Sequence, residues 1–289
     1  MGDSTRHHQF RALLVLGRVS NLPTVWSNCL AAWWLGGGRT VNRLPLLLAG
    51  ATGLYLGGMF LNDLLDAASD RRLRPERPIP AGEISPQTVW IWAQAWLGIG
   101  ALLLILLGQT TGALALLLLV TILGYDALHQ RIAFAPLLMA GCRLLLYLVA
   151  ASTGARGVTG WAIWCGLGMA VYVLGVSLLA RPERAARKPG YGPTLLLATP
   201  IALAVLLHSR AVPEGVVLLA LVLGLWITRS LRPAFWSEER AVAETVSLLL
   251  AGIVLVDWLA VADAPREFSL VFLLLFGAAL VFQRFVPAS

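Results

Sequence analysis

Three aspartates and one asparagine are spaced so that they share one face of a helix. Asn62, Asp63, Asp66 and Asp70 begin the stretch NDLLDAASDRRLRPERPIPAG. At about 100° per residue, the three aspartates point about 100°, 40° and 80° away from the asparagine, within one quarter of the helix surface. We call these four residues the aspartate face. Carboxylates this close repel one another, so a positive partner is expected nearby.

Two kinds of positive partner would suit the aspartate face. The chain continues with four basic residues, Arg71, Arg72, Arg74 and Arg77, which could form a solvated salt-bridge patch. Oxygen ligands also suit Mg²⁺, which keeps several waters and bridges to substrate phosphates, and arginines can hold the remaining phosphate oxygens. Because acidic groups at a membrane boundary are usually functional, we favour a site for Mg²⁺ and a diphosphate.

A proline-rich segment follows the aspartate face. Pro75, Pro78 and Pro80 cannot continue a helix, so we expect a stiff, extended loop that ends in a turn at Gly82. Such a loop could hold Arg77 over a phosphate at little cost in ordering entropy.

The elements that must position these residues are apolar. The chain has 289 residues, of which 58% are hydrophobic and 13% charged, whereas soluble chains carry about 25% charged residues. Runs of about 20 apolar residues recur, and each could cross a bilayer as a helix. Continuous apolar blocks argue against a barrel of alternating strands. We therefore expect an all-α, polytopic membrane protein with a single domain over residues 1–289.

Ten membrane spans are expected along the chain. Their approximate ranges are 13–35, 44–62, 88–108, 111–128, 135–153, 159–180, 193–209, 215–231, 243–262 and 268–286. Two long polar loops, at 63–87 and 181–192, then fall on the same side of the membrane. Chemistry is expected where these two loops converge.

The basic residues predict the orientation. With the N-terminus inside, sixteen of them lie on or near the cytoplasmic side and five outside, and Arg143 is the one assigned to the interior of a span. This positive-inside bias predicts that the N-terminus and the aspartate face are cytoplasmic. The membrane is expected to be a bacterial inner membrane. It also accounts for the net charge of +7 without nucleic-acid binding. The three cysteines, Cys29, Cys142 and Cys165, lie in spans and suggest neither disulfides nor a metal site.

Several segments resemble one family. The pattern N-D-x-x-D-x-x-x-D followed by R-P-I-P-x-G resembles the first signature of the UbiA superfamily of intramembrane prenyltransferases. GRVSNLPTVWSN resembles that family's first helix, with Asn21 in the place of an asparagine that faces the diphosphate. GYDALHQR matches its tyrosine segment through Tyr125, with His129 or Gln130 near the usual lysine. GCRLLLYLVAAS resembles the fifth helix, with Arg143 matching.

This resemblance, over about residues 10–190, implies nine to ten transmembrane helices around a central cavity. It implies Mg²⁺-dependent transfer of an isoprenyl group from a prenyl diphosphate to an aromatic or lipid-soluble acceptor, as in quinone or isoprenoid lipid biosynthesis. The expected catalytic residues are Asp66, Asp70, Tyr125 and Arg143. The expected substrate contacts are Asn21, Arg77, Arg181 and Lys188. The expected metal ligands are the aspartate face and Glu183.

The family's second acidic signature is degenerate here. In place of D-x-x-x-D, the chain has SLLARPERAARKPG, where Glu183 is the only acid. Either Glu183 alone holds a second metal or that metal is absent, and the neighbouring basic residues could bind the diphosphate instead. Three alternatives therefore stay open: phosphoribosyl transfer to a polyprenyl phosphate, an inactive binding relative, and a non-catalytic transporter of anions or lipids.

Two acidic residues lie within spans away from the aspartate face. Asp126, near the cytoplasmic end of its span, is expected either to pair with Arg143 or to act as a base on the acceptor. Asp257, in the outer half of its span, is expected to be a structural hydrogen-bond acceptor.

Overall fold

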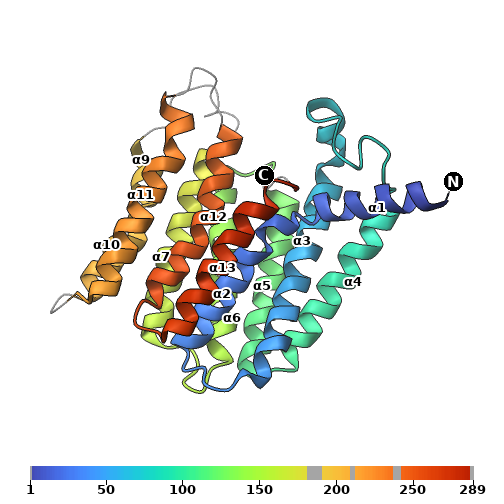
Figure 1. Cartoon of the computed structure of the whole chain (residues 1–289). Coiled ribbons are helices and arrows are strands. Elements are labelled where there is room, and N and C mark those ends of the chain that lie inside the picture. Colours follow the sequence, from blue (N-terminus) through green and yellow to red (C-terminus); the bar gives the residue numbers. More distant parts are fainter. Residues whose placement is uncertain (1, 181–190, 209–211, 237–241, 287–289) are drawn as a thin grey trace.

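The computed structural model describes residues 2–180, 191–208, 212–236 and 242–286, and all of their regular elements are helical (Figure 1). Seven helices of this described part are long and apolar enough to cross a bilayer. They are α3, α4, α5, α6, α7, α11 and α12, and their bounds follow below. The all-α expectation is confirmed, and the chain is an integral membrane protein.

The first half of the bundle contains the aspartate face. Its elements are α1 (Gly2–Leu16), η1 (Val19–Asn21), α2 (Leu22–Leu35), η2 (Val41–Arg43), α3 (Leu44–Leu73), α4 (Pro86–Ile105), α5 (Gln109–Leu128) and α6 (Ala135–Ser152). The first expected span is not one continuous helix, because the chain breaks between α1 and α2. Helix α3 continues well beyond the expected end at residue 62, and this extension includes the three aspartates of the aspartate face.

The second half consists of α7 and the helices that follow it in the chain. Its elements are α7 (Gly160–Leu179), α9 (Tyr191–Leu196), α10 (Thr199–Leu207), α11 (Glu214–Trp236), α12 (Val242–Ala260) and α13 (Arg266–Phe282). The span expected at 193–209 is divided into α9 and α10 by a turn before Pro200, which lies in the first turn of α10. Proline is favoured there because the first turn needs no amide donor.

Glycines allow α3 and α4 to pack with their backbones in near contact. A methyl group added at Gly53 would lie 2.8 Å from the Cα of Gly100, and one added at Gly100 would lie 2.6 Å from the amide nitrogen of Leu54. Small residues at helix interfaces permit such close approach in membranes, where van der Waals packing drives association. This contact fixes the position of the helix that carries the aspartate face.

Two hydrophobic clusters form the core. One is built mainly from α1 to α6, and the other from α7 and α10 to α12. Trp258 of α12 and Phe276 of α13 pack against both clusters and join them. Large apolar side chains such as Leu102, Leu218 and Leu274 point outward, as expected for a surface that faces lipid.

Candidate active site

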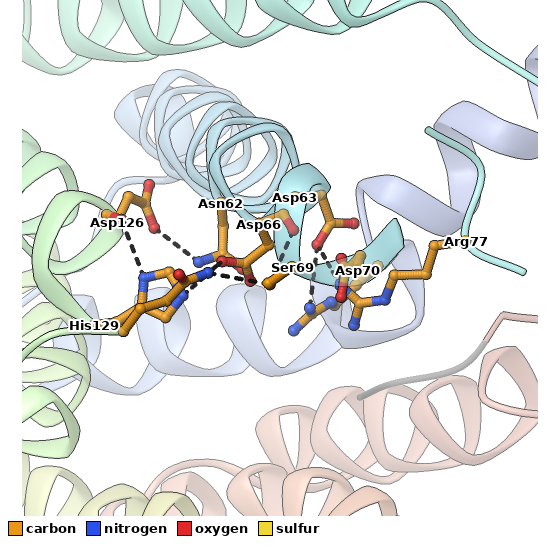
Figure 2. Close-up of polar contacts among 10 residues, drawn as sticks. Asn62, Asp63, Asp66, Ser69, Asp70, Arg77, Asp126 and His129 are labelled. Carbon is orange, nitrogen blue, oxygen red and sulfur yellow. Dashed lines mark hydrogen bonds and ion pairs between the residues drawn. The ribbon is translucent and has the colours of Figure 1, made fainter. Parts of the chain in front are cut away.

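Two carboxylates of the aspartate face meet at one guanidinium nitrogen. Nη1 of Arg77 donates to Oδ1 of Asp63 at 3.2 Å and to Oδ2 of Asp70 at 2.9 Å (Figure 2). Both carboxylates lie on α3, seven residues apart. The predicted sharing of one helix face is thus observed for Asp63 and Asp70, and the positive partner is Arg77 of the following loop.

The loop that carries Arg77 is compact. Its turns are closed by backbone hydrogen bonds from Arg77 to Arg74 at 3.1 Å and from Ala81 to Arg77 at 2.9 Å. Ile79 and Ile84 are buried in the core and anchor the loop. The expected turn at Gly82 is confirmed, since its φ is +76°. The expectation of an extended loop was wrong, because these hydrogen bonds fold the segment into successive turns.

Arg18 is a second cation beside Asp63, and sequence reasoning did not assign it to the site. Its Nη2 donates to Asp63 Oδ1 at 3.4 Å. Arg18 lies in the break between α1 and α2 with a left-handed φ of 40°, and its carbonyl accepts a 3.2 Å hydrogen bond from Tyr55. The signals that could have revealed the break were Gly17 and Pro23, which mark a helix end and a helix start.

Asp66 faces α5 instead of Arg77. Its Oδ1 contacts Nε2 of His129 at 2.9 Å and the side-chain amide of Gln130 (Figure 2). Nδ1 of His129 lies 3.0 Å from the backbone carbonyl of Asp126. Because both ring nitrogens face acceptors, the arrangement favours the protonated imidazole. The hydrogen bond to Asp66 accordingly raises the pKa of His129 above its ordinary value.

The start of the aspartate face also contacts α5. Nδ2 of Asn62 donates to Oδ1 of Asp126 at 3.3 Å, so Asp126 pairs with Asn62 and not with Arg143. The ring of Tyr125 stacks on His129 with 5.2 Å between the ring centroids. The end of α5 therefore brings Tyr125, Asp126 and His129 together beside the aspartate face.

Arg143 lies in a separate polar network inside the bundle. Its guanidinium donates to Asn28 Oδ1 at 2.8 Å and to Thr24 Oγ1 at 3.0 Å. Asn28 and Ser27 in turn donate to one oxygen of Asp257, at 2.7 and 2.6 Å. Asp257 thus accepts hydrogen bonds as expected. Among the described residues, the hydrogen bonds of Arg143 join α6 to α2 and not to the aspartate face.

The remaining expected site residues fall into two groups. Asn21 is buried at the end of η1, three residues after Arg18. Arg181, Glu183 and Lys188 lie outside the described residues, so the expectations for the second acidic signature stay predictions.

The donor atoms at this site fit Mg²⁺ with a phosphorylated ligand. Within the described ranges, no group of three or more histidine, cysteine or acidic side chains lies close enough to hold a metal alone. However, Asp63 and Asp70 already converge on one positive group, and Mg²⁺ characteristically takes one or two carboxylates and completes its shell with water and phosphate. Arg18 and Arg77 are positioned to take the phosphate oxygens that the metal leaves free.

Comparisons with known proteins all point to the same family. The model of the UbiA prenyltransferase family matches residues 20–231. A digeranylgeranylglyceryl phosphate synthase of Methanothrix thermoacetophila is 43% identical over 74 residues, which are 25% of this chain and 28% of that protein. One of Ignicoccus hospitalis is 35% identical over 109 residues, which are 38% and 36% of the two chains. The chain thus spans about a third of the length of these curated relatives.

Solved structures share the fold over most of their length. A UbiA homologue from Aeropyrum pernix K1 superposes with a TM-score of 0.66 and 19% identity, covering 86% of this chain and 98% of the homologue. A UbiA homologue from Archaeoglobus fulgidus, bound to GPP and Mg²⁺, superposes with a TM-score of 0.62 and 15% identity, covering 94% and 99% of the two chains.

Proposed function

The chain belongs to the UbiA prenyltransferase family, and we propose that it is an enzyme that transfers a prenyl group from a prenyl diphosphate to a hydrophobic acceptor with the help of Mg²⁺. The family membership confirms the resemblance drawn from the aspartate face. The observation that carries the proposal is the convergence of Asp63 and Asp70 on a single guanidinium nitrogen of Arg77. Two carboxylates held around one positive charge, at the end of a membrane helix, suit a metal–diphosphate complex.

In this mechanism the aspartate face and its arginines bind the diphosphate end of the donor. Asp63 and Asp70, which converge on Arg77, would hold Mg²⁺, and Asp66 and the Asn62 amide oxygen are the further donors that the sequence predicts. When bound, Mg²⁺ neutralises the diphosphate and stabilises charge on the departing oxygen. Arg77 and Arg18 then pair with phosphate oxygens instead of carboxylates, which suits electrostatic stabilisation of a leaving group.

The end of α5 orients and shields the reacting carbon. His129 and Gln130 hold Asp66 through two hydrogen bonds to its Oδ1. The ring of Tyr125, stacked on His129, supplies an aromatic face that can stabilise an allylic cation. Apolar helix walls exclude water from that cation. A catalytic role for Arg143 finds less support, because its contacts are to Thr24 and Asn28.

The acceptor is proposed to be a lipid in preference to a free aromatic compound. The support is the name of the relatives, digeranylgeranylglyceryl phosphate synthase, which refers to a glyceryl phosphate lipid. An aromatic acceptor of the quinone type is the second candidate from the sequence. Only about a third of each relative aligns with this chain. The acceptor class is therefore to be identified by direct assay.

Orientation and domain organisation are also proposals. The excess of basic residues at the end that carries the aspartate face supports a cytoplasmic active site. The relatives come from archaea, so a bacterial inner membrane has support only from the sequence. Trp258 and Phe276, which pack against both hydrophobic clusters, support a single domain over the whole chain.

The proposed reaction can be tested with the purified chain in detergent or nanodiscs. Allylic diphosphates of several lengths are incubated with lipid or aromatic acceptors and Mg²⁺, and diphosphate release and new products are measured by enzymatic assay and mass spectrometry. We expect a prenylated product that Asp66→Ala abolishes and the matched surface change Glu267→Ala does not. A ribosylated polyprenyl phosphate among the products would support the phosphoribosyl alternative. A folded protein that releases no diphosphate would refute the proposed enzymatic function.

A further inference from the structure

A cavity lined by both charged and apolar side chains lies at the end of the bundle opposite the aspartate face. In Figure 1 this is the end where α2 connects to α3, whereas residues 74–85 lie at the other end. The cavity has a volume of about 330 Å³. Five segments meet there and contribute Trp34, Arg156, Trp161, His208 and Asp263. None of these residues belongs to the proposed active site.

An apolar crevice adjoins this cavity and extends it toward the membrane interior. It runs between α7, α10 and α12 and shares Trp161, His208, Leu259 and Ala260 with the cavity. Its further lining includes Gly168, Leu203 and Val256. With a volume of about 30 Å³ it cannot enclose a chain, so a hydrocarbon chain would lie along it as a groove open to lipid. A chamber that contains charged side chains, joined to an apolar groove, matches the two halves of an amphiphile.

The charges in the cavity are of opposite sign. Arg156 is exposed, and its side chain donates a long hydrogen bond of 3.4 Å to the carbonyl of Leu35. Asp263 lies 3.5 Å from Nε2 of His208, yet its side chain is 65% exposed and keeps acceptor capacity. A ligand with separate negative and positive groups could pair with both Arg156 and Asp263. A purely anionic ligand would instead be repelled by the carboxylate of Asp263.

Aromatic rings mark the cavity as interfacial. Trp161 is 45% exposed, and its ring lies 5.3 Å from that of His208. Trp34, at the end of α2, also lines the cavity, and the guanidinium of Arg39 lies over its ring, 5.5 Å from the centroid. Tryptophan is favoured where hydrocarbon meets lipid headgroups, and its ring face attracts an ammonium group.

We propose that this cavity and crevice bind one bilayer phospholipid with a phosphoethanolamine headgroup. Arg156 pairs with the phosphate, and Asp263 and the ring of Trp161 receive the ammonium. One acyl chain lies along the crevice between α7, α10 and α12. Because Trp34 and Arg156 belong to the first half of the bundle and His208 to the second, the bound lipid joins the two halves and stabilises the fold. This site is independent of the proposed reaction.

The test uses the full chain, delipidated in detergent and then supplied with phosphatidylethanolamine or phosphatidylglycerol of identical acyl chains. Native mass spectrometry measures lipid retention, and tryptophan fluorescence measures the unfolding midpoint. We expect one retained phosphatidylethanolamine per chain, a higher midpoint, and weaker retention of phosphatidylglycerol. Arg156→Ala and Asp263→Asn should each lower retention by about tenfold, since each removes a charge-assisted contact.

Matched controls are available at the same end of the bundle. Arg266→Ala and Glu267→Gln change exposed charges that do not line the cavity, and both should retain the lipid as the unaltered chain does. Ala204→Phe fills the crevice and should lower retention while leaving both charges in place. Equal retention of the two lipids, or retention unaffected by Arg156→Ala, Asp263→Asn and Ala204→Phe, would overturn the proposal.

Discussion

Replacing Arg77 with alanine removes the guanidinium that separates two carboxylates. The Arg77 side chain is 16% exposed, and those of Asp63 and Asp70 are 7% and 9% exposed. Removing one partner from a buried pair costs about 3–5 kcal/mol. Arg18 remains beside Asp63 and solvent reaches part of the site, so we expect Arg77→Ala to lower the free energy of unfolding by about 2–3 kcal/mol.

The same variant should respond strongly to magnesium. Without Arg77, the carboxylates of Asp63 and Asp70 lose their shared counterion, and a divalent cation can take that place. Excess Mg²⁺ should therefore raise the unfolding midpoint of Arg77→Ala more than that of the unaltered chain. The assay is thermal unfolding in detergent, followed by tryptophan fluorescence, with and without Mg²⁺.

Arg74→Ala is the matched control for this experiment. Arg74 is an exposed arginine at the start of the same loop, so its removal should change stability by less than about 1 kcal/mol and leave the response to Mg²⁺ unchanged. Equal destabilisation by the two variants would refute the structural role of Arg77. A midpoint of Arg77→Ala that Mg²⁺ does not raise would refute the idea that the guanidinium occupies a cation site.

Three further predictions concern the reaction and the bundle. Asp66→Asn should lower the rate of Mg²⁺-dependent diphosphate release by about 10²–10³-fold in a steady-state assay, and an unchanged rate would contradict its role. Arg143→Met should destabilise the protein by about 3 kcal/mol in thermal unfolding, because it removes the hydrogen-bond donors from a buried network. The control Arg39→Met changes an exposed residue and should not destabilise the protein in this way. Gly100→Val should lower the free energy of unfolding by about 3 kcal/mol, because the larger side chain forces α3 and α4 apart. The control Gly98→Val, whose added Cβ meets no atom within 4 Å, should fold normally. Equal destabilisation by the two variants would contradict the close packing of α3 and α4.

The sequence was most informative where local geometry alone decides the arrangement. The spacing of Asp63 and Asp70 along a helix requires no tertiary information, and the structure places both carboxylates on Arg77 as that spacing predicts. The apolar blocks likewise predicted the all-α membrane fold, because helices are what such segments form in lipid. The family resemblance rested on the same local motif.

Contacts between distant segments could not be predicted in this way. Arg18 reaches Asp63 across 45 residues only because the chain breaks with a left-handed residue between α1 and α2. Asp66 turns to His129, 63 residues away, although its spacing suggested that it would share a partner with Asp70. The compact loop of Arg77 depends on the burial of Ile79 and Ile84, and proline spacing alone favours an extended segment.

Metal binding at the aspartate face can be measured directly with Mn²⁺, which shares the preference of Mg²⁺ for carboxylate and water ligands. Electron paramagnetic resonance reports bound Mn²⁺ in the presence of a non-hydrolysable prenyl diphosphate. The unaltered chain and the surface variant Glu267→Gln should bind the ion, and the double variant Asp63→Asn with Asp70→Asn should not. Undiminished binding by the folded double variant would contradict the assignment of these carboxylates to a metal–diphosphate site.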